Sequence, residues 1–251
     1  MSNGRLLFVF EGQKSEINII ENVSKNFSKT FPNISANENV KCAYCTTIYS
    51  LYKAISKDEY LDMFMLLKEK EFNKEILKDF SRVDFAEIYL FFDYDGHTSS
   101  ANDDSLSQII NLFNEETAFG KIFISYPMVE ALKHISSAIN FKELKFEVKK
   151  GKEYKKIVNQ SCDKEYTDFN KYNKDIWIKL VEMHLKKVNF IVNNNFSMPN
   201  DIISQDEIFL KQLEKYIRID ATIAVSSAFP VFIFDYYGYD IVSKLIKTGK
   251  I

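Results

Sequence analysis

The chain has 251 residues, of which 46% are hydrophobic and 15% aromatic, enough apolar material for one large globular domain or two small ones. It carries 33 Lys and Arg against 35 Asp and Glu, so the formal charge of -2 excludes a strongly basic protein, and any contact with a polyanion must come from a local patch. No apolar run approaches the roughly 20 residues that cross a bilayer, and the odd number of three cysteines argues against a disulfide framework. These features predict a cytoplasmic protein that makes no use of a membrane.

Apolar periodicity predicts alternating strands and helices over the first 140 residues. The strands are short runs rich in β-branched and aromatic residues, and the helices repeat apolar residues at intervals of three and four. In chain order the predicted elements are strand 5–10, helix 14–27, strand 40–49, helix 58–80, strand 87–92, helix 103–113, strand 121–125 and helix 128–139. This order predicts an α/β fold with a mainly parallel sheet flanked by helices.

The character of the chain changes near residue 140, where a charge-rich stretch begins. Helical patterns follow at residues 174–194 and 205–219, and residues 223–238 are compatible with either a strand or a buried helix. We therefore predict an α/β domain over residues 1–140 and a mostly helical C-terminal region, 141–251, packed on it.

Acidic residues follow three of the predicted strands. Glu11 comes directly after the first strand, Asp93 and Asp95 follow the third, and Glu130 lies five residues beyond the end of the fourth. In open α/β sheets functional groups gather beyond the carboxyl ends of the strands, so we expect one crevice to collect these side chains. Asp93 and Asp95 are two residues apart and, on extended backbone, would point to the same side.

Carboxylates in this arrangement suit a divalent cation. Mg²⁺ prefers oxygen ligands in octahedral geometry, and Mg²⁺ or Mn²⁺ held by three or four carboxylates would polarise a phosphate and ready a water for attack. Gly12 permits a sharp turn after Glu11 and leaves room for a phosphate. Glu16 is predicted either as an outer ligand or as an acid that favours the helix N-terminus. His97, directly after the acidic pair, is placed to orient a phosphate or to act as a general acid.

Each of these signals also has a purely structural interpretation. Residues 11–16 match an ordinary turn between a strand and a helix, and residues 93–97 match an Asp-Gly turn with a histidine of no special role. Glu130 alone is typical of a solvated helix residue. What favours the metal site is that the acids occur together, each after a strand.

Cysteine and histidine add few further candidates. Cys42 and Cys45 form one C-x-x-C pair, for which ordinary thiols are a better interpretation than half a zinc site or a redox pair. His134 follows Glu130 by four residues and would support it from the same helix face. His184, inside an apolar helical pattern, is predicted to be a hydrogen-bonded core or surface residue.

The order Glu-Gly, then Asp-x-Asp, on an alternating α/β frame resembles the Toprim domain of topoisomerases, DnaG-type primases, small RNA-maturation nucleases and OLD-family nucleases. In that domain the glutamate and the Asp-x-Asp pair bind divalent metal. More narrowly, "FVFEGQKSE" is similar to the glutamate motif of RloB-like proteins, and "SYPMVEALKH" is similar to a second stretch of theirs. The residues that fall on this second pattern are Ser125, Pro127, Glu130 and His134.

The resemblance covers roughly residues 5–135 and implies that residues 1–140 form a Toprim-like catalytic domain. Many members have an Arg between the two aspartates or a further acid after them, whereas this chain has Tyr94 and Gly96-His97, so one or two metals are both open. RloB-like and OLD-related proteins occur in bacterial phage-defence systems, often beside an ABC- or SMC-like ATPase. The resemblance implies that setting and such a partner.

Residues 142–156 offer a surface for a polyanion. They carry seven lysines against three glutamates, interleaved with Phe146 and Tyr154, which would track a phosphate backbone and stack on bases. A solvated, lysine-rich hairpin is the alternative. The residues predicted to contact nucleic acid are Gly12, Lys149, Lys150, Lys152, Lys155 and Lys156.

The leading hypothesis is a metal-dependent Toprim-type nuclease that cuts a phosphodiester in DNA or RNA as the toxin of an anti-phage system. Its predicted catalytic residues are Glu11, Asp93, Asp95, Glu130 and His97, with Glu16 as a peripheral metal ligand. The alternatives are a non-catalytic Toprim-like module that binds an ATPase or nucleic acid, and a phosphotransfer enzyme that acts on a small nucleotide. Whether copies of the chain form a homo-oligomer is open.

Overall fold

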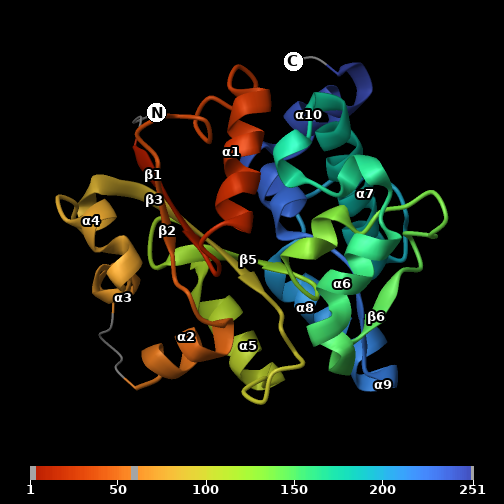
Figure 1. The fold of residues 1–251 in the computed structure, drawn as a ribbon, viewed down its shortest axis with the longest axis horizontal. Coiled ribbons are helices and arrows are strands. Elements are labelled where there is room, and N and C mark those ends of the chain that lie inside the picture. The colour runs from red at the N-terminus through yellow and green to blue at the C-terminus, as the bar shows by residue number, and fades with distance from the viewer. Residues whose placement is uncertain (1–3, 58–61, 250–251) are drawn as a thin grey trace. The chain divides into compact units, whose positions relative to one another are not determined.

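The computed structural model describes residues 4–57 and 62–249. Its main sheet has five strands in the order β2-β1-β3-β5-β4, which confirms the predicted α/β fold (Figure 1). β1 (Arg5–Phe10) runs parallel to both of its neighbours, β2 (Val40–Ala43) and β3 (Phe85–Asp93). At the other edge β4 (Asn114–Glu115) pairs antiparallel with β5 (Gly120–Ser125). The sheet is therefore mainly parallel, as predicted.

The chain divides into two compact units. The first comprises Met1–Phe92 and Asn102–Ile122, and the second comprises Asp93–Ala101 and Phe123–Ile251. The boundary thus falls within the last residues of β3 and inside β5. The domain ranges 1–140 and 141–251 stay a prediction.

Aromatic side chains from two strands form the centre of the first unit's core. Phe8 and Phe10 of β1 alternate with residues that face the other side of the sheet, so they share one face. There Phe8 meets the rings of Tyr89 and Phe91 on β3, and Phe10 meets that of Phe91. The centroid distances are 5.3 Å for Phe10 and Phe91 and 6.1 Å for Phe8 and Tyr89. The four rings are buried and contribute much of the apolar area that stabilises this unit.

Helices of the first unit follow the strands in the predicted alternation. They are α1 (Ser15–Phe27), α2 (Ile48–Ile55), α3 (Met63–Glu69), α4 (Lys74–Leu77) and α5 (Asp103–Leu112). α2 and α5 lie side by side, where the Tyr52 hydroxyl donates to Oε1 of Gln108 at 2.7 Å (Figure 1). α1 and α5 confirm the helices predicted at 14–27 and 103–113 to within one residue at each end.

The single long helix predicted over residues 58–80 is wrong. Its first four residues lie outside the described part of the chain, and the rest is broken into α3, a 3-10 turn at Glu71–Asn73, and α4. The buried Asn73 side chain causes the break: its Nδ2 donates to the carbonyls of Ala43 (2.9 Å) and Leu67 (3.0 Å), and its Oδ1 accepts from the N–H of Ala43 at 3.1 Å. These hydrogen bonds join the turn to the end of β2. Apolar periodicity gives no information on such bonds.

Two further elements are shorter than predicted. The strand predicted at 40–49 ends at Ala43, because Cys45 takes a positive φ of 66° and Thr47 caps α2 by accepting from the N–H of Ser50. The helix predicted at 128–139 is a five-residue 3-10 helix, Val129–Lys133, labelled η3. The second segment contains Glu130 of the candidate site, so its true end matters for the geometry of that site.

The second unit is mostly helical, as predicted for the C-terminal region. Its helices are α6 (Gly151–Ser161), α7 (Lys174–Asn193), α8 (Gln205–Gln212), α9 (Arg218–Asp220) and α10 (Ala228–Thr248). α8 continues through a π-helical turn, Leu213–Ile217, into α9, which together match the helix predicted at 205–219. α7 and α10 pack closely against one another, and the fully buried Trp177 of α7 belongs to this core.

A two-stranded ribbon in the second unit fixes the structure of two segments whose structure the sequence left open. β6 (Lys145–Glu147) pairs antiparallel with the distant β7 (Thr222–Ala224), so the lysine-rich stretch 142–156 is not a hairpin and continues instead into α6. The ambiguous stretch 223–238 contains both predicted states, because β7 is followed after three residues by the start of α10.

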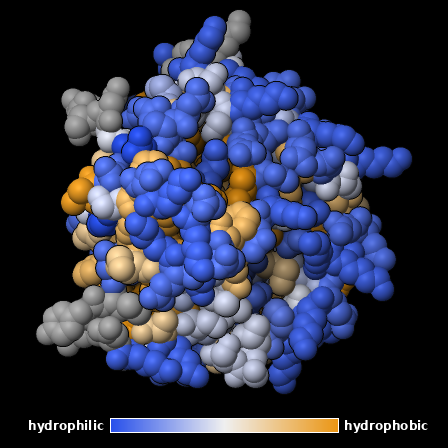
Figure 2. Space-filling model, turned by 60° about the vertical axis from the view of Figure 1, so that its left-hand side comes forward, coloured by the Kyte–Doolittle hydropathy of each residue, from blue (hydrophilic) through white to orange (hydrophobic). Residues whose placement is uncertain are grey.

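The surface drawn in Figure 2 is mainly hydrophilic, and its apolar side chains form small separate groups. Single exposed apolar residues, such as Val83 at 90% and Ile219 at 72% exposure, are normal on a folded protein. In the part of the chain that the structure describes, no helix combines the length and the apolar character needed to cross a membrane.

Candidate active site

Glu11 and Gly12 follow β1 directly, as predicted. The Glu11 N–H donates to the Phe91 carbonyl at 2.9 Å and its own carbonyl accepts from Cys45, so this residue prolongs the sheet. The Gly12 N–H donates to Oε1 of Glu16 at 3.1 Å, and Glu16 is only 6% exposed. Glu16 therefore accepts a hydrogen bond from a backbone N–H of the turn before α1, which is the helix-start role predicted for it as one alternative.

Asp93 is the last residue of β3, and Asp95 no longer lies on extended backbone. The N–H of Tyr94 donates to the carbonyl of Ser125 at 3.0 Å, while Asp95 takes a positive φ of 44° and donates its N–H to Pro127 at 3.2 Å. Aspartate tolerates this left-handed conformation better than most residues. The expectation that both carboxylates stand on one side of an extended strand is wrong for this reason.

Asp95, His97 and Glu130 interact electrostatically within the second unit. Nδ1 of His97 lies 3.8 Å from Oδ1 of Asp95, close enough for an ion pair but too far for a hydrogen bond, and the two side chains are 12% and 16% exposed. Burial raises the pKa of Asp95, the negative charge of Glu130 raises that pKa further, and His97 lowers it. Negative charge is therefore costly here, which a cation would relieve.

Helix α6 brings a lysine to the buried Glu130. Nζ of Lys155 lies 3.3 Å from Oε1 of Glu130, whose side chain is 5% exposed although that of Lys155 is 66% exposed. Gly151, one turn earlier on the same side of α6, packs against His97, because a Cβ atom at Gly151 would lie 2.2 Å from Nδ1 of His97. The start of α6 thus lies so close to His97 that only glycine fits at position 151. The sequence does not single out Gly151, since this contact joins distant segments.

The other predicted lysines lie on the surface of the second unit. Lys150 pairs with Glu147 at 2.6 Å, and Lys149, Lys152 and Lys156 are exposed. Lys152 and Lys156 are four residues apart on α6 and therefore share a face. One unit thus carries these lysines together with Asp93, Asp95, His97 and Glu130, whereas Glu11, Gly12 and Glu16 belong to the first unit.

Tyr154 cannot stack on bases, because it is fully buried. Its ring meets Phe146 edge-on with centroids 4.7 Å apart, and its hydroxyl forms a 3.0 Å hydrogen bond with Nδ1 of His134. Burial, then the charges of Glu130 and Asp93, raise the pKa of Tyr154 well above its usual value. Tyr154, which the sequence analysis placed on the surface, is thus buried near the carboxylates. Its spacing with Gly151 and Val158 puts the three residues on one face of the helix, and this pattern indicates that it is buried.

His134 does not share a helix face with Glu130, because η3 ends at Lys133. Burial lowers the pKa of His134 to about 4, so the ring that meets Tyr154 is neutral near pH 7. Ser125, from the same motif, accepts a 3.3 Å hydrogen bond at its Oγ from the N–H of Ala228 and so supports the start of α10.

Burial of Cys42 disfavours a metal or redox role for the cysteine pair. Burial raises the pKa of the Cys42 thiol to about 12, which disfavours the thiolate that such chemistry requires. Cys45 is exposed and accepts from Nε2 of Gln13 at 3.1 Å. Across residues 4–57 and 62–249, no group of three or more His, Cys, Asp and Glu side chains is arranged to hold a metal ion. The metal site predicted from the sequence stays a prediction.

Comparison with known proteins adds no assignment. No family model matches the chain, and neither the curated proteins nor the solved structures include a significant match. The likeness to Toprim domains therefore rests on the quoted motifs.

Proposed function

We propose that this chain is a divalent-metal-dependent nuclease that hydrolyses phosphodiester bonds in DNA or RNA. The observation that carries the proposal is the grouping, within the second unit, of the partly buried Asp95, the buried Glu130 and the His97 ring beside the lysine-bearing helix α6. A carboxylate whose pKa is raised by burial, with a second carboxylate and a histidine acting on it, is typical of functional sites. The adjacent lysines supply the positive charge that a nucleic-acid backbone requires.

The donor set fits Mg²⁺ or Mn²⁺ in its chemistry. Asp93, Asp95 and Glu130 of the second unit offer the oxygen ligands that these ions prefer. A bound ion would polarise the phosphate and activate a water for attack. Burial raises the pKa of Asp95, and the charge of Glu130 raises it further, which supports this assignment because a cation would stabilise both charged forms.

The chain's own side chains have distinct roles in this proposal. Lys155 pairs with Glu130 when no substrate is bound, and its mostly exposed side chain is long enough to turn to a phosphate oxygen instead. His97 is placed beside Asp95 to orient the phosphate or to protonate the leaving oxygen. Lys149, Lys150, Lys152 and Lys156 hold the nucleic-acid backbone.

The biological setting proposed here follows from the resemblance to RloB-like and OLD-related proteins. We expect the protein to act in the cytoplasm as the toxin of an anti-phage system, with an ABC- or SMC-like ATPase as its partner. Such a partner would hold the nuclease inactive until infection.

The test is cleavage of plasmid, single-stranded DNA and total tRNA by the purified chain with Mg²⁺ or Mn²⁺. We expect cutting that disappears with EDTA and falls by at least about 100-fold in Asp95→Asn and Glu130→Gln, since each removes a charge on which the chemistry depends. The matched control is Asp240→Asn, an exposed aspartate of α10 in the same unit. Cutting that survives EDTA and both site variants would contradict the proposal.

One observation favours the non-catalytic alternative, namely that Lys155 already neutralises Glu130. A binding module would retain affinity for nucleic acid or for the ATPase without cleaving any substrate, with or without the partner. It would also bind Mn²⁺ no better than the Asp95→Asn variant does. That combination of results would replace the nuclease by the module.

A further inference from the structure

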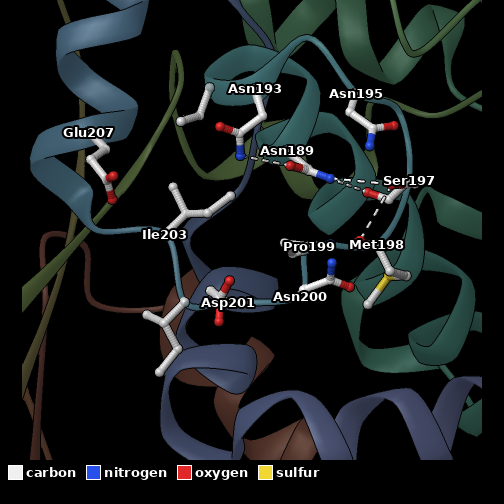
Figure 3. Close-up of a pocket in the computed structure, with 12 residues that line it drawn as sticks. Asn189, Asn193, Asn195, Ser197, Met198, Pro199, Asn200, Asp201, Ile203 and Glu207 are labelled. Carbon is white, nitrogen blue, oxygen red and sulfur yellow. Dashed lines mark hydrogen bonds between the residues drawn. The ribbon is translucent and has the colours of Figure 1, made fainter.

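A cavity of about 390 Å³ opens in the second unit, lined by the end of α7, the loop 194–204 and the start of α8 (Figure 3). This volume lies within the roughly 300–1,000 Å³ typical of small-molecule sites. The described residues that line it include none of the carboxylates or lysines assigned to the nuclease. The cavity therefore needs an explanation of its own.

Asparagine side chains dominate the polar lining. The Nδ2 group of Asn193 donates to Oδ1 of Asn189 at 2.9 Å, and Nδ2 of Asn189 donates to the carbonyl of Ser197 at 2.9 Å, so these two amides are fixed in orientation (Figure 3). Asn195 and Asn200 also line the cavity, and within the described chain the structure gives their side-chain amides no hydrogen-bond partner. Each such amide presents one acceptor and one donor group side by side.

The charge of the lining disfavours an anion. Asp201 and Glu207 are its charged members, and among its described residues there is no lysine, arginine or histidine. Oε2 of Glu207 accepts from both the N–H and the hydroxyl of Ser204, so it belongs to the cap of α8. A phosphate or carboxylate would meet no countercharge here, so the lining is unsuited to an anionic ligand.

Apolar side chains complete the walls. Ile203 is 8% exposed, and in the view of Figure 3 it stands on one side of Asn189 while Met198 stands on the other. Val192 and Pro199 add further apolar lining. A flat ring fits such walls, since a thioether and aliphatic groups pack well against a ring face.

The loop that forms the cavity is held at both ends. At the end of α7, Asn194 takes a left-handed conformation, and Nζ of Lys215 donates to its Oδ1 at 2.9 Å and to the carbonyl of Ile191 at 2.6 Å. At the start of α8, Ser204 and Glu207 form a reciprocal capping box. A pre-formed site loses less conformational entropy when a ligand binds.

We propose that this cavity binds a nucleobase. A base has apolar faces and an edge on which donors and acceptors alternate, and asparagine amides pair with such edges. The walls of the cavity would contact the faces, and the amides of Asn195 and Asn200 would contact the edge. This function is additional to the proposed nuclease and does not depend on it.

The experiment is a calorimetric titration of the full chain with adenosine, guanosine, cytidine and uridine in EDTA, so that metal-dependent chemistry plays no part. At least one nucleoside should saturate the protein with a Kd no weaker than about 1 mM. The double variant Asn195→Ala with Asn200→Ala should raise that Kd about tenfold or more. Asn195→Trp, which fills the cavity from an exposed position, should abolish binding.

Controls separate the base from other ligands. Asn140→Ala, an exposed asparagine elsewhere in the same unit, should bind as the unmodified chain does. A trinucleotide that binds more tightly than its nucleosides would place the base in a strand, and one that binds no more tightly would place it in a free nucleoside; both support a base site. Equal binding of ribose or spermidine, unchanged binding by the variants, or no saturation by any nucleoside would overturn the proposal. Because these outcomes need no cleavage, they are independent of the nuclease test.

Discussion

His184 is fully buried in the second unit, where both of its ring nitrogens meet backbone groups. The N–H of Ser227 donates to its Nδ1 at 3.1 Å, so the ring proton resides on Nε2, which faces the carbonyl of Leu132 at 3.2 Å. Burial lowers the pKa of His184 to about 3, against an ordinary value of 6.5. His184 is therefore a hydrogen-bonded core residue, which is one of the two roles predicted for it from the sequence.

The buried His184 should make the protein less stable in acid. Between the folded pKa of about 3 and the unfolded value of 6.5, the unfolded chain binds more protons at His184, so the free energy of unfolding falls as the pH drops through this window. The contribution of His184 should be about 2 kcal/mol smaller at pH 5 than at pH 7. Urea unfolding of the unmodified chain and of His184→Gln at both pH values isolates the contribution of His184, because the neutral glutamine does not titrate. An equal pH dependence in both proteins would contradict this prediction.

Among the candidate-site residues, the sequence could predict those that act near their own strand. Glu11, Asp93 and Asp95 were predictable because an apolar run ends beside each of them, and the structure places all three at the ends of β1 and β3. The helix spacing of Tyr154 indicated its burial, but the roles of Gly151 and Tyr154 could not be predicted, because they depend on contacts with His97 and His134, which are distant in the sequence.

At the scale of elements, apolar periodicity locates a strand or helix, and polar side chains decide where it ends. The strands at 5–10 and 121–125 were predictable to within a residue because they are buried apolar runs. The break in residues 58–80 was not, since it depends on bonds between Asn73 and β2.

Removing the Asn73 side chain should therefore loosen the link between α3, α4 and β2. Asn73→Ala leaves the N–H and carbonyl of Ala43 and the carbonyl of Leu67 without their buried partner. We expect the free energy of unfolding to fall by about 3 kcal/mol. Asn37→Ala, an exposed asparagine of the same unit, should change it by less than about 0.5 kcal/mol. Denaturant titration distinguishes the two, and equal losses would refute the proposed role of Asn73.

The approach of α6 to His97 gives a test at the same scale. A methyl group at position 151 would lie 2.2 Å from Nδ1 of His97, so Gly151→Ala must displace either the ring or the start of the helix. Helix propensity alone favours alanine by about 1 kcal/mol, and we expect the clash to reverse this into a net loss of about 1–3 kcal/mol.

Unfolding by urea and the histidine NMR signals would be measured for Gly151→Ala and for Lys152→Ala, a neighbouring exposed position. Only the glycine variant should lose stability and shift the signal of His97. A gain in stability with an unchanged His97 signal would show that α6 and His97 do not pack as the structure has them.

At the scale of the whole molecule, charge limits how the chain can bind a polyanion. With a formal charge of -2 there is no global attraction, so the proposed contact with nucleic acid depends on the lysines of η4 (Val148–Lys150) and α6. These are Lys149, Lys150, Lys152, Lys155 and Lys156. Each phosphate contact contributes about 0.9 to the slope of log K against log salt for duplex DNA. Five contacts therefore set an upper limit of about 4.5 on that slope.

Replacing Lys149, Lys152 and Lys156 by glutamine should reduce the slope by about 2.7 and weaken binding at low salt. The matched control replaces Lys164, Lys244 and Lys247, exposed lysines of the same unit, and thus changes the net charge equally. Fluorescence anisotropy in EDTA, where no metal-dependent cleavage occurs, gives the slope for each protein. If net charge governed binding, both triple variants would lose the same affinity. If the lysine face of α6 governs binding, only the first triple variant loses affinity, since screening at a Debye length near 10 Å confines the attraction to nearby charges.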